Sequence, residues 1–473
     1  MNRDHWTQEA NRSPFAAHPT LPGRQNSFVG ILLLIIASSF GLGQAEEVSW
    51  PPTLPNGKAF AVVEGAKLLS GVGAELREGV EIAKKAPRVT FHFYDCQTYE
   101  GKPWSVWGDG LAIGGKYYSA VGDHLSPEGN AWVYVFDPEK NVLTPLTNVR
   151  KILQRPDGHY TPGKIHSQLG MGKDGWIYFS THRGSTRVAL DPKNHFQGDS
   201  IFRVHPESGD AEIVAEIPLP MQCLPTGSLD GERMIWYAGS ADGLNEKEPQ
   251  FLAYDIEEGR ILYRDDRGPY RAMILARSTG KLYFHGGKPG GKGRSGEAPL
   301  YRFDPENPAP PTRIDASVGL RAASEESPEG KVYTLDRDEI WEFDVTNETA
   351  RSLGGSAVAS KDYTTSLKLS PDGRFLYYIP GAHGGSEQDG TPVVQFDTRT
   401  GKKKVICFLH PAIENATGYV PIGSFGSGLS EDGSTLYVTW NGAHDLTGEE
   451  KKVPFRSVGM TMIEIPESER LTQ

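Results

Sequence analysis

The chain has 473 residues, 55 of them glycine and 34 proline, and its formal net charge is −11 at pH 7. The aromatic content of 10% excludes a disordered chain, and the glycine and proline content suits many tight turns. The acidic balance argues against nonspecific nucleic-acid binding, which depends on clustered Lys and Arg.

An apolar segment near the N-terminus predicts export. Residues 28–45 (FVGILLLIIASSFGLGQA) follow Arg24 and end in the small-residue pattern Gly43-Gln44-Ala45. We interpret residues 1–45 as a cleaved signal peptide and expect a secreted or periplasmic protein with no membrane contact after cleavage. An uncleaved anchor is the alternative, because the run approaches the roughly 18 residues that can span a bilayer.

Residues 46–87 form a lead-in segment. Within it, Gly73–Lys85 is amphipathic, and we expect a short helix that packs on the main domain. Residues 88–94 (RVTFHFY) alternate between apolar and polar side chains and therefore predict a β-strand.

The rest of the chain repeats one short pattern: a glycine in a turn, followed by a strand rich in aromatic and apolar residues. The copy at Gly175 reads Gly-Trp-Ile-Tyr-Phe, and the copy at Gly373 reads Gly-Arg-Phe-Leu-Tyr-Tyr. A spacing of 43 to 60 residues, filled with strands and turns, is typical of a β-propeller. The repeat glycines are Gly115, Gly175, Gly231, Gly280, Gly330, Gly373 and Gly433.

Each copy continues into a third and a fourth strand. Third strands end in pairs such as Phe303-Asp304 and Phe396-Asp397, and a polar turn such as Arg399-Thr400-Gly401 leads to the next strand. We therefore predict an all-β, seven-bladed propeller over residues 88–466, with four antiparallel strands per blade and a C-terminal tail at 467–473. The predicted blades are 104–150, 163–218, 222–266, 270–315, 319–354, 362–409, and 420–466 together with 88–95.

The seventh repeat lacks a fourth strand. Its third strand is Val458–Ile465, and the sequence ends at Gln473. We expect the strand at 88–94 to supply the missing outer strand, which closes the ring and removes a sheet edge. Cys96, Cys223 and Cys407 are widely spaced with no CxxC pair, so we expect buried free thiols.

The innermost strands of a propeller begin at the mouth of its central channel, where closed β-architectures bind ligands. Counting back nine residues from each repeat glycine predicts one mouth residue per blade. Arg271 and Arg321 stand out, because guanidinium groups hold carboxylate, sulfate or phosphate with paired hydrogen bonds. The predicted ring is Val106, His166, Gln222, Arg271, Arg321, Thr364 and Ser424.

We expect Arg271 and Arg321, with Gln222, to bind an anionic saccharide or another small anionic ligand. Structural ion pairs are the alternative role for the two arginines. The candidate carboxylates, which are close to them in sequence, are Asp265, Asp266, Glu325 and Glu326.

Histidines recur in the loops after the aromatic strands, which should open on the same face. His166 and His182 belong to adjacent strands of one blade, so they could act as a base with its partner or share a divalent metal. Tyr160, in the loop entering that blade, could donate a proton or stack on a sugar. Arg183 and His383 are further candidate ligand contacts. The histidines at this loop position are His124, His182, His285, His383 and His444.

The repeat pattern resembles the secreted propellers of the YVTN and streptogramin-lyase type over roughly residues 88–466. The segment from Lys164 to Ser167 and the segment from Asp174 to Gly184 also resemble a group of secreted bacterial propellers of undefined activity. In related seven-bladed oligogalacturonate lyases, β-elimination takes place at the channel mouth, with histidines and a glutamine on a metal. The close Gln-His-His cluster of that family is absent here, so the resemblance implies the fold and a mouth site but no metal ligands.

Two functions follow as expectations, and the sequence leaves both open. In the first, the protein is a lyase that acts by β-elimination on a uronate-containing saccharide. Arg271 and Arg321 then neutralise the carboxylate, and His166 or His182 removes the proton. Tyr160 or a second histidine protonates the leaving oxygen. In the second, the same face of a noncatalytic propeller binds carbohydrate or protein. We expect a monomer, and the cofactor is undetermined.

Overall fold

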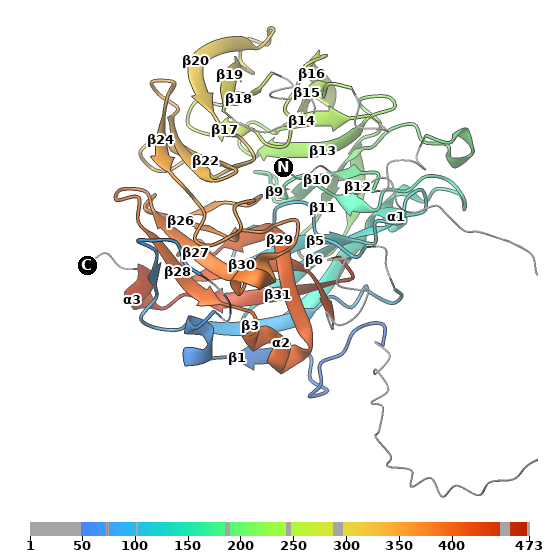
Figure 1. Ribbon diagram of the computed structural model, residues 1–473. Coiled ribbons are helices and arrows are strands. Elements are labelled where there is room, and N and C mark those ends of the chain that lie inside the picture. Colours follow the sequence, from blue (N-terminus) through green and yellow to red (C-terminus); the bar gives the residue numbers. More distant parts are fainter. Residues whose placement is uncertain are drawn as a thin grey trace, which may run out of the picture. The chain divides into compact units, whose positions relative to one another are not determined.

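The computed structural model describes residues 49–71, 73, 75–100, 103–184, 190–242, 247–286, 297–444 and 455–470. Within them the chain forms seven antiparallel sheets of four core strands each, which confirms the predicted propeller (Figure 1). The predicted signal peptide lies outside the described residues. None of the described helices is long and apolar enough to cross a membrane.

The repeat glycines make the tight turns between the first and second strand of their blades. Gly175 and Gly373 adopt left-handed backbone conformations, with φ of 82° and 72°. A side chain would strain these turns, because a β-carbon disfavours positive φ. Six of the seven repeat glycines have a positive φ, with Gly231 the exception, so the residue that defines the repeat in the sequence also fixes the turn in six blades.

The blades follow the predicted boundaries closely. The first three contain β4 (Leu111–Ile113), β5 (Lys116–Gly122), β6 (Ala131–Asp137), β7 (Val142–Asn148), β8 (Lys164–Ile165), β9 (Gly170–Met171), β10 (Ile177–His182), β11 (Ile201–Val204), β12 (Ala211–Ala215), β13 (Cys223–Asp230), β14 (Ile235–Ala241), β15 (Phe251–Asp255) and β16 (Arg260–Asp265). The next three contain β17 (Ile274–Ala276), β18 (Lys281–His285), β19 (Ala298–Phe303), β20 (Thr312–Val318), β21 (Ala322–Ala323), β22 (Lys331–Asp336), β23 (Glu339–Asp344), β24 (Thr349–Gly354), β25 (Lys368–Leu369), β26 (Phe375–Tyr378), β27 (Pro392–Asp397) and β28 (Lys403–Phe408).

The seventh blade is closed by a strand from the beginning of the domain, as predicted. It contains β29 (Tyr419–Leu429), β30 (Thr435–His444) and β31 (Ser457–Glu464), and β3 (Arg88–Phe93) pairs antiparallel with β31. β1 (Ala61–Val63) then adds a fifth strand outside β3 (Figure 1). The ring is therefore joined by backbone hydrogen bonds between distant parts of the chain.

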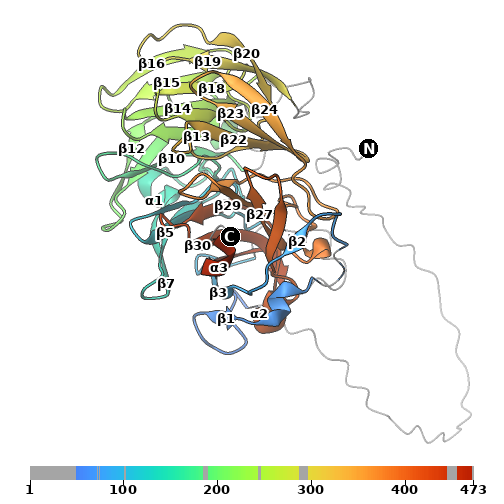
Figure 2. The same cartoon turned by 90° about the vertical axis from the view of Figure 1, so that its left-hand side faces the viewer.

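The lead-in segment differs from the prediction. No helix forms in the described part of Gly73–Lys85; instead β2 (Glu81–Ile82) pairs in parallel with β28 at the outer edge of the sixth blade. The C-terminal helix α3 (Glu467–Arg470) helps to hold this segment, because the Glu469 carboxylate accepts hydrogen bonds from the backbone of Lys84 and Lys85 (Figure 2). Pairing with a distant edge thus outweighs the local amphipathic pattern.

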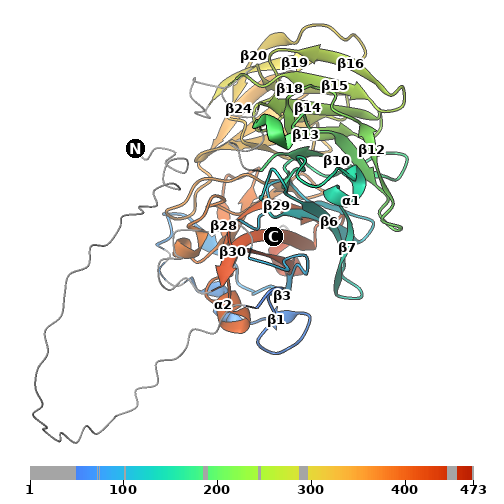
Figure 3. The same ribbon diagram turned by 90° about the vertical axis from the view of Figure 1, so that its right-hand side faces the viewer.

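Short helices occupy peripheral positions. α1 (Val149–Leu153) follows β7 beside β12, and Asn148 caps it by accepting a hydrogen bond from the backbone of Lys151 (Figure 3). α2 (Ala412–Thr417) precedes β29 (Figure 1). The remaining helices are single 3-10 turns: η1 (Ala66–Leu69), η2 (Pro192–Asn194) and η3 (Ser386–Asp389).

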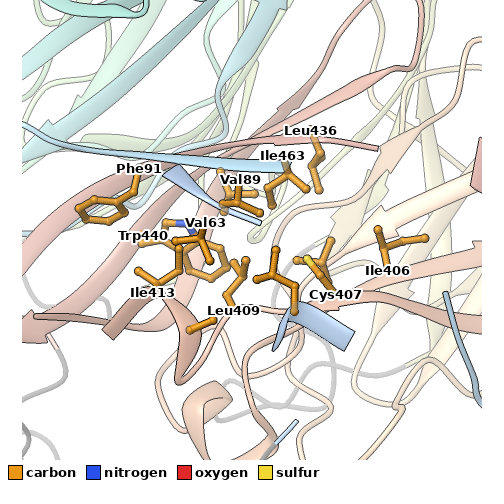
Figure 4. Packing of buried hydrophobic residues seen from close by; sticks show 14 of the residues in the cluster. Val63, Val89, Phe91, Ile406, Cys407, Leu409, Ile413, Leu436, Trp440 and Ile463 are labelled. Atoms are coloured by element: carbon orange, nitrogen blue, oxygen red, sulfur yellow. The ribbon is translucent and has the colours of Figure 1, made fainter. Parts of the chain in front are cut away.

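Buried side chains fill the space between neighbouring sheets. Around the closing strand, Phe91 packs in one cluster with Trp440, Ile463 and Cys407 (Figure 4). All three cysteines are buried and unpaired, in agreement with the sequence prediction.

Candidate functional site

A cavity lies where the inner strands of the seven blades begin. It holds about 530 Å³ of empty space, open solvent at its mouth included. Every blade contributes to its wall, so it is the mouth of the central channel. One wall residue from each blade, in order, is Trp107, His166, Thr226, Arg271, Arg321, Thr365 and Phe425.

Arg321 lines this cavity from the fifth blade. Its side chain is 6% exposed, and its Nε donates a hydrogen bond of 2.7 Å to the Tyr363 hydroxyl. The guanidinium also lies 5.3 Å from the centre of the Tyr363 ring and 5.7 Å from that of Phe425. Among the described residues, no carboxylate pairs with it.

Arg271 faces the same cavity from the fourth blade and is exposed. Its φ is 77°, a conformation that an L-residue with a long side chain rarely adopts. Its guanidinium lies 5.0 Å from the ring centre of Tyr270, and it forms no ion pair within the described part of the chain. Residues held in such sparsely populated conformations cluster at functional sites.

Within the described residues, the carboxylates considered as structural partners form no ion pair with Arg271 or Arg321. Glu325 lies 3.6 Å from the Lys368 ammonium, and Glu326 accepts hydrogen bonds from the backbone and hydroxyl of Ser278. Asp265 accepts from the Tyr263 hydroxyl. Within the described residues, Arg271 and Arg321 are therefore free to meet a ligand.

His166 lies at the point where the inner strand of the second blade is interrupted, between β8 and β9. Its Nδ1 donates a hydrogen bond of 3.0 Å to the carbonyl oxygen of Pro225, so in the neutral ring Nε2 carries the lone pair. Burial holds the pKa of His166 well below its ordinary value, and Lys164, Arg271 and Arg321 add to this effect. The ring is therefore neutral at pH 7, with its tautomer fixed.

His182 is buried next to His166, with 5.7 Å between the ring centres. Its Nδ1 accepts from the backbone of Gly184, while Nη1 of Arg183 approaches its Nε2 at 3.1 Å. Burial, and then the Arg183 charge, hold its pKa well below the ordinary value. Donors face both ring nitrogens, and a neutral imidazole accepts at only one of them, so this setting disfavours the charged imidazolium still more.

Arg183 lies next to the His182 ring. It has no exposed surface, and its Nε and Nη2 have no hydrogen-bond partner among the described residues. It is therefore a buried positive charge behind His182 and does not line the cavity.

His383 is not a wall residue but lies near two of them, Trp107 and Phe425, with ring centres 6.1 Å and 5.1 Å away. Burial lowers the pKa of His383 to about 4, and Arg321, Arg271 and Lys164 contribute. With His124, which lies 5.8 Å from the Trp107 ring, three of the six histidines noted in the sequence gather around this tryptophan. His285 instead forms a hydrogen bond with the carbonyl oxygen of Val318, and His444 packs against Tyr419.

Two predicted residues lie away from the mouth. Tyr160 is fully buried against Phe196, and its hydroxyl donates to Asp199 at 2.9 Å, so it does not reach the cavity. Gln222 accepts a hydrogen bond from the Ser240 hydroxyl and also lies outside the cavity wall. β13 carries a bulge between Cys223 and Thr226, which brings residues 225–228 to the wall instead.

Several residues at or near the mouth were not predicted, and three of them bear on the chemistry of the site. Trp107 follows the predicted Val106 by one position, and Phe425 is the bulged residue of β29 between Ser424 and Gly426. Lys164 lies two positions before His166, on the same side of the strand, and its ammonium lies 3.9 Å from the centre of the Trp107 ring. The period-2 alternation from His166 could have identified it.

The floor of the cavity is a buried ion pair between blades. The Asp109 carboxylate lies 2.9 Å from the ammonium of Lys368 and accepts hydrogen bonds from the Ser366 hydroxyl and the Ser427 backbone. Burial alone would lower the pKa of Lys368, but Asp109 and Glu325 raise it above its ordinary value. The carboxylate in the cavity is thus already neutralised.

Metal binding finds no support in the geometry. In the described part of the chain, no three His, Cys, Asp or Glu side chains come together as a metal site. The wall combines cationic groups, neutral imidazoles and aromatic rings, which suits an organic anion.

Comparisons with known proteins leave the family unassigned. The chain matches no protein-family profile, and no curated protein matches its sequence. It is similar to a chain in a solved structure titled "Crystal Structure of Mitotic Checkpoint Complex", with 11% identity and a TM-score of 0.48, over 86% of this chain and 99% of that one. A likeness at this level carries no information about function.

Proposed function

We propose that the channel mouth binds a small anionic ligand. The observation that carries this proposal is Arg321, a buried guanidinium without a carboxylate partner among the described residues, beside the equally unpaired Arg271. Burying an unpaired charge costs several kcal/mol, and a bound anion offsets this cost. Two guanidinium groups on neighbouring blades suit a carboxylate, which accepts hydrogen bonds on both oxygens.

The ligand class that fits best is a saccharide carrying a carboxylate. Trp107 and Phe425 present aromatic surface next to the cations, and aromatic rings stack on sugar faces. The neutral His166 offers an acceptor nitrogen to a sugar hydroxyl. The predicted signal peptide and the resemblance to exported propellers favour a ligand outside the cytoplasm.

Elimination is the catalytic form of this proposal, and His166 is the group that favours it. Its Nε2 lone pair would take the proton next to the uronate carboxylate, the freed electrons would form the carbon–carbon double bond, and the bond to the leaving oxygen would break. Tyr160 lies outside the cavity, so the leaving oxygen would receive its proton from the His166 imidazolium or from water. Noncatalytic binding of carbohydrate or protein on the same face is the alternative.

Calorimetric titration with trigalacturonate and with an uncharged galactose trimer tests the binding proposal. We expect only the charged trimer to bind, and Arg321→Met to weaken binding roughly tenfold to hundredfold, since a charge-assisted hydrogen bond contributes about 1.5–3 kcal/mol. Arg374→Met, which removes an ion pair with Asp397 in the sixth blade, is the matched control and should leave affinity unchanged. Equal binding of both trimers would contradict the proposal.

The elimination step has its own test. Unsaturated uronate ends absorb in the ultraviolet, so their release from polygalacturonate can be followed directly. We expect His166→Ala to abolish release, while His205→Ala, which changes a histidine next to Trp176, retains it. Tight binding without any unsaturated product from the unaltered protein would select the noncatalytic alternative.

A further inference from the structure

Lys164 is a buried lysine without a counterion. It is the first residue of β8, opposite His182, and its side chain is 7% exposed. Within the described residues, its ammonium makes no hydrogen bond or ion pair and instead lies over the Trp107 ring. Two other lysines with buried or half-buried side chains are paired by contrast: Lys368 with Asp109, and Lys404 with Glu469, each at 2.9 Å.

The surroundings of Lys164 disfavour its charge. Burial holds the pKa of Lys164 well below its ordinary value, and the nearby Arg183 and Arg271 lower it further. The Trp107 ring acts in the opposite direction, but a cation–π contact contributes only about 0.5–2 kcal/mol. A desolvated lysine next to other cations is the arrangement that activates an amine as a nucleophile.

We propose that Lys164 forms an imine with a carbonyl compound that carries a carboxylate, such as an oxo acid or the open-chain aldehyde of a uronic acid. The inference rests on the proposed anion site. Lys164 is not itself a wall residue, but its ammonium lies over the ring of Trp107, which lines the same cavity as Arg271 and Arg321. The two arginines would hold the carboxylate, and the carbonyl carbon would reach the amine past the Trp107 ring. Compared with the proposed function, the inference specifies a carbonyl group in the ligand and a covalent bond between the ligand and Lys164.

The step balances without any oxidant or reductant. The uncharged Lys164 amine attacks the carbonyl carbon, and the carbonyl π electrons move to the oxygen. A proton passes from nitrogen to that oxygen, giving a carbinolamine. The nitrogen lone pair then forms the carbon–nitrogen double bond as one water leaves.

Reductive trapping on the full chain tests the inference. Glyoxylate and cyanoborohydride would be added at neutral pH, and the modified lysines mapped by mass spectrometry. We expect labelling at Lys164 at least about tenfold above that at Lys404, because each unit by which a lysine pKa falls increases the free amine tenfold. Lys164→Arg keeps the positive charge but removes the amine, so this label should be lost; Lys404→Met, the matched control, should keep it.

Binding of glycolate, which has the carboxylate but no carbonyl, separates the two proposals. Glycolate binding to the unaltered protein and to Lys164→Arg, with preferential trapping of glyoxylate on Lys164 alone, supports the inference. Glycolate binding without preferential labelling of Lys164 overturns the imine and leaves the anion site standing. Failure of both glycolate and trigalacturonate to bind overturns the anion site and, with it, this inference.

Discussion

Arg271 combines a strained backbone with a position in the cavity wall. A left-handed conformation costs a residue with a β-carbon roughly 1 kcal/mol, and glycine avoids this cost. An arginine at φ 77° therefore lowers the stability of the fold, while this conformation positions its guanidinium at the cavity. We infer that the strain is retained because the side chain meets the ligand.

We expect Arg271→Gly to raise the free energy of unfolding by up to about 1 kcal/mol, because the relieved strain exceeds the extra backbone entropy that glycine loses on folding, and to weaken binding of the anionic ligand. Urea denaturation and calorimetric titration measure the two effects. Gln154→Gly is the matched control, because Gln154 is exposed, has φ 47° and ends α1 far from the cavity wall. It should gain similar stability and keep full affinity. A loss of stability in Arg271→Gly would show that Arg271 has a structural role.

The residues at the mouth could be predicted in the blades where nine residues separate the mouth from the repeat glycine. Counting back along the chain therefore placed His166, Arg271 and Arg321 at the cavity. It failed for Gln222, because a bulge in β13 shifts the register. The sequence could not predict that Lys164 lacks a counterion, since this depends on which carboxylates of other blades lie near the lysine in the fold.

The elements of the propeller were predictable for a similar reason. Turn glycines and alternating side chains are local signals, and they defined the seven hairpin sets and the closing strand β3. β1 and β2 have only three and two residues, and their pairing is decided by the outer strands of distant blades. A local pattern carries no information about such edges, which explains why a helix was wrongly expected at Gly73–Lys85.

The closing strand β3 should carry a large share of the stability. Phe91 has no exposed surface and contacts Phe93 and Tyr419, with ring centres 4.9 Å and 5.1 Å away. Phe91→Ala should lower the free energy of unfolding by about 3–5 kcal/mol in urea denaturation, the usual cost of emptying a buried aromatic site. Arg88→Ala on the same strand removes only surface ion pairs with Glu64 and Glu464. It should cost less than about 1 kcal/mol, and equal costs for both variants would contradict a closure held by packing.

For the whole molecule, the neutral histidines predict how stability depends on pH. Burial lowers the pKa of each of seven histidines, and that of His383 and His444 falls to about 4. Between the folded value and the unfolded value near 6.5, the unfolded chain binds more protons, so stability is full above pH 6.5 and falls as the pH decreases. The seven histidines are His92, His124, His166, His182, His285, His383 and His444.

Unfolding free energies measured in urea from pH 7.5 to pH 4.5 should therefore decrease steadily toward acid. Burial raises the pKa of Asp199 to about 6 and also raises those of Asp123 and Glu387, which opposes this trend, but these are three groups against seven. A bound carboxylate ligand favours protonation of the imidazoles around Trp107, so saturation with ligand should flatten the acid side of the curve. A ligand that binds elsewhere would raise the whole curve without changing its slope, and constant stability down to pH 4.5 would contradict the neutral imidazoles themselves.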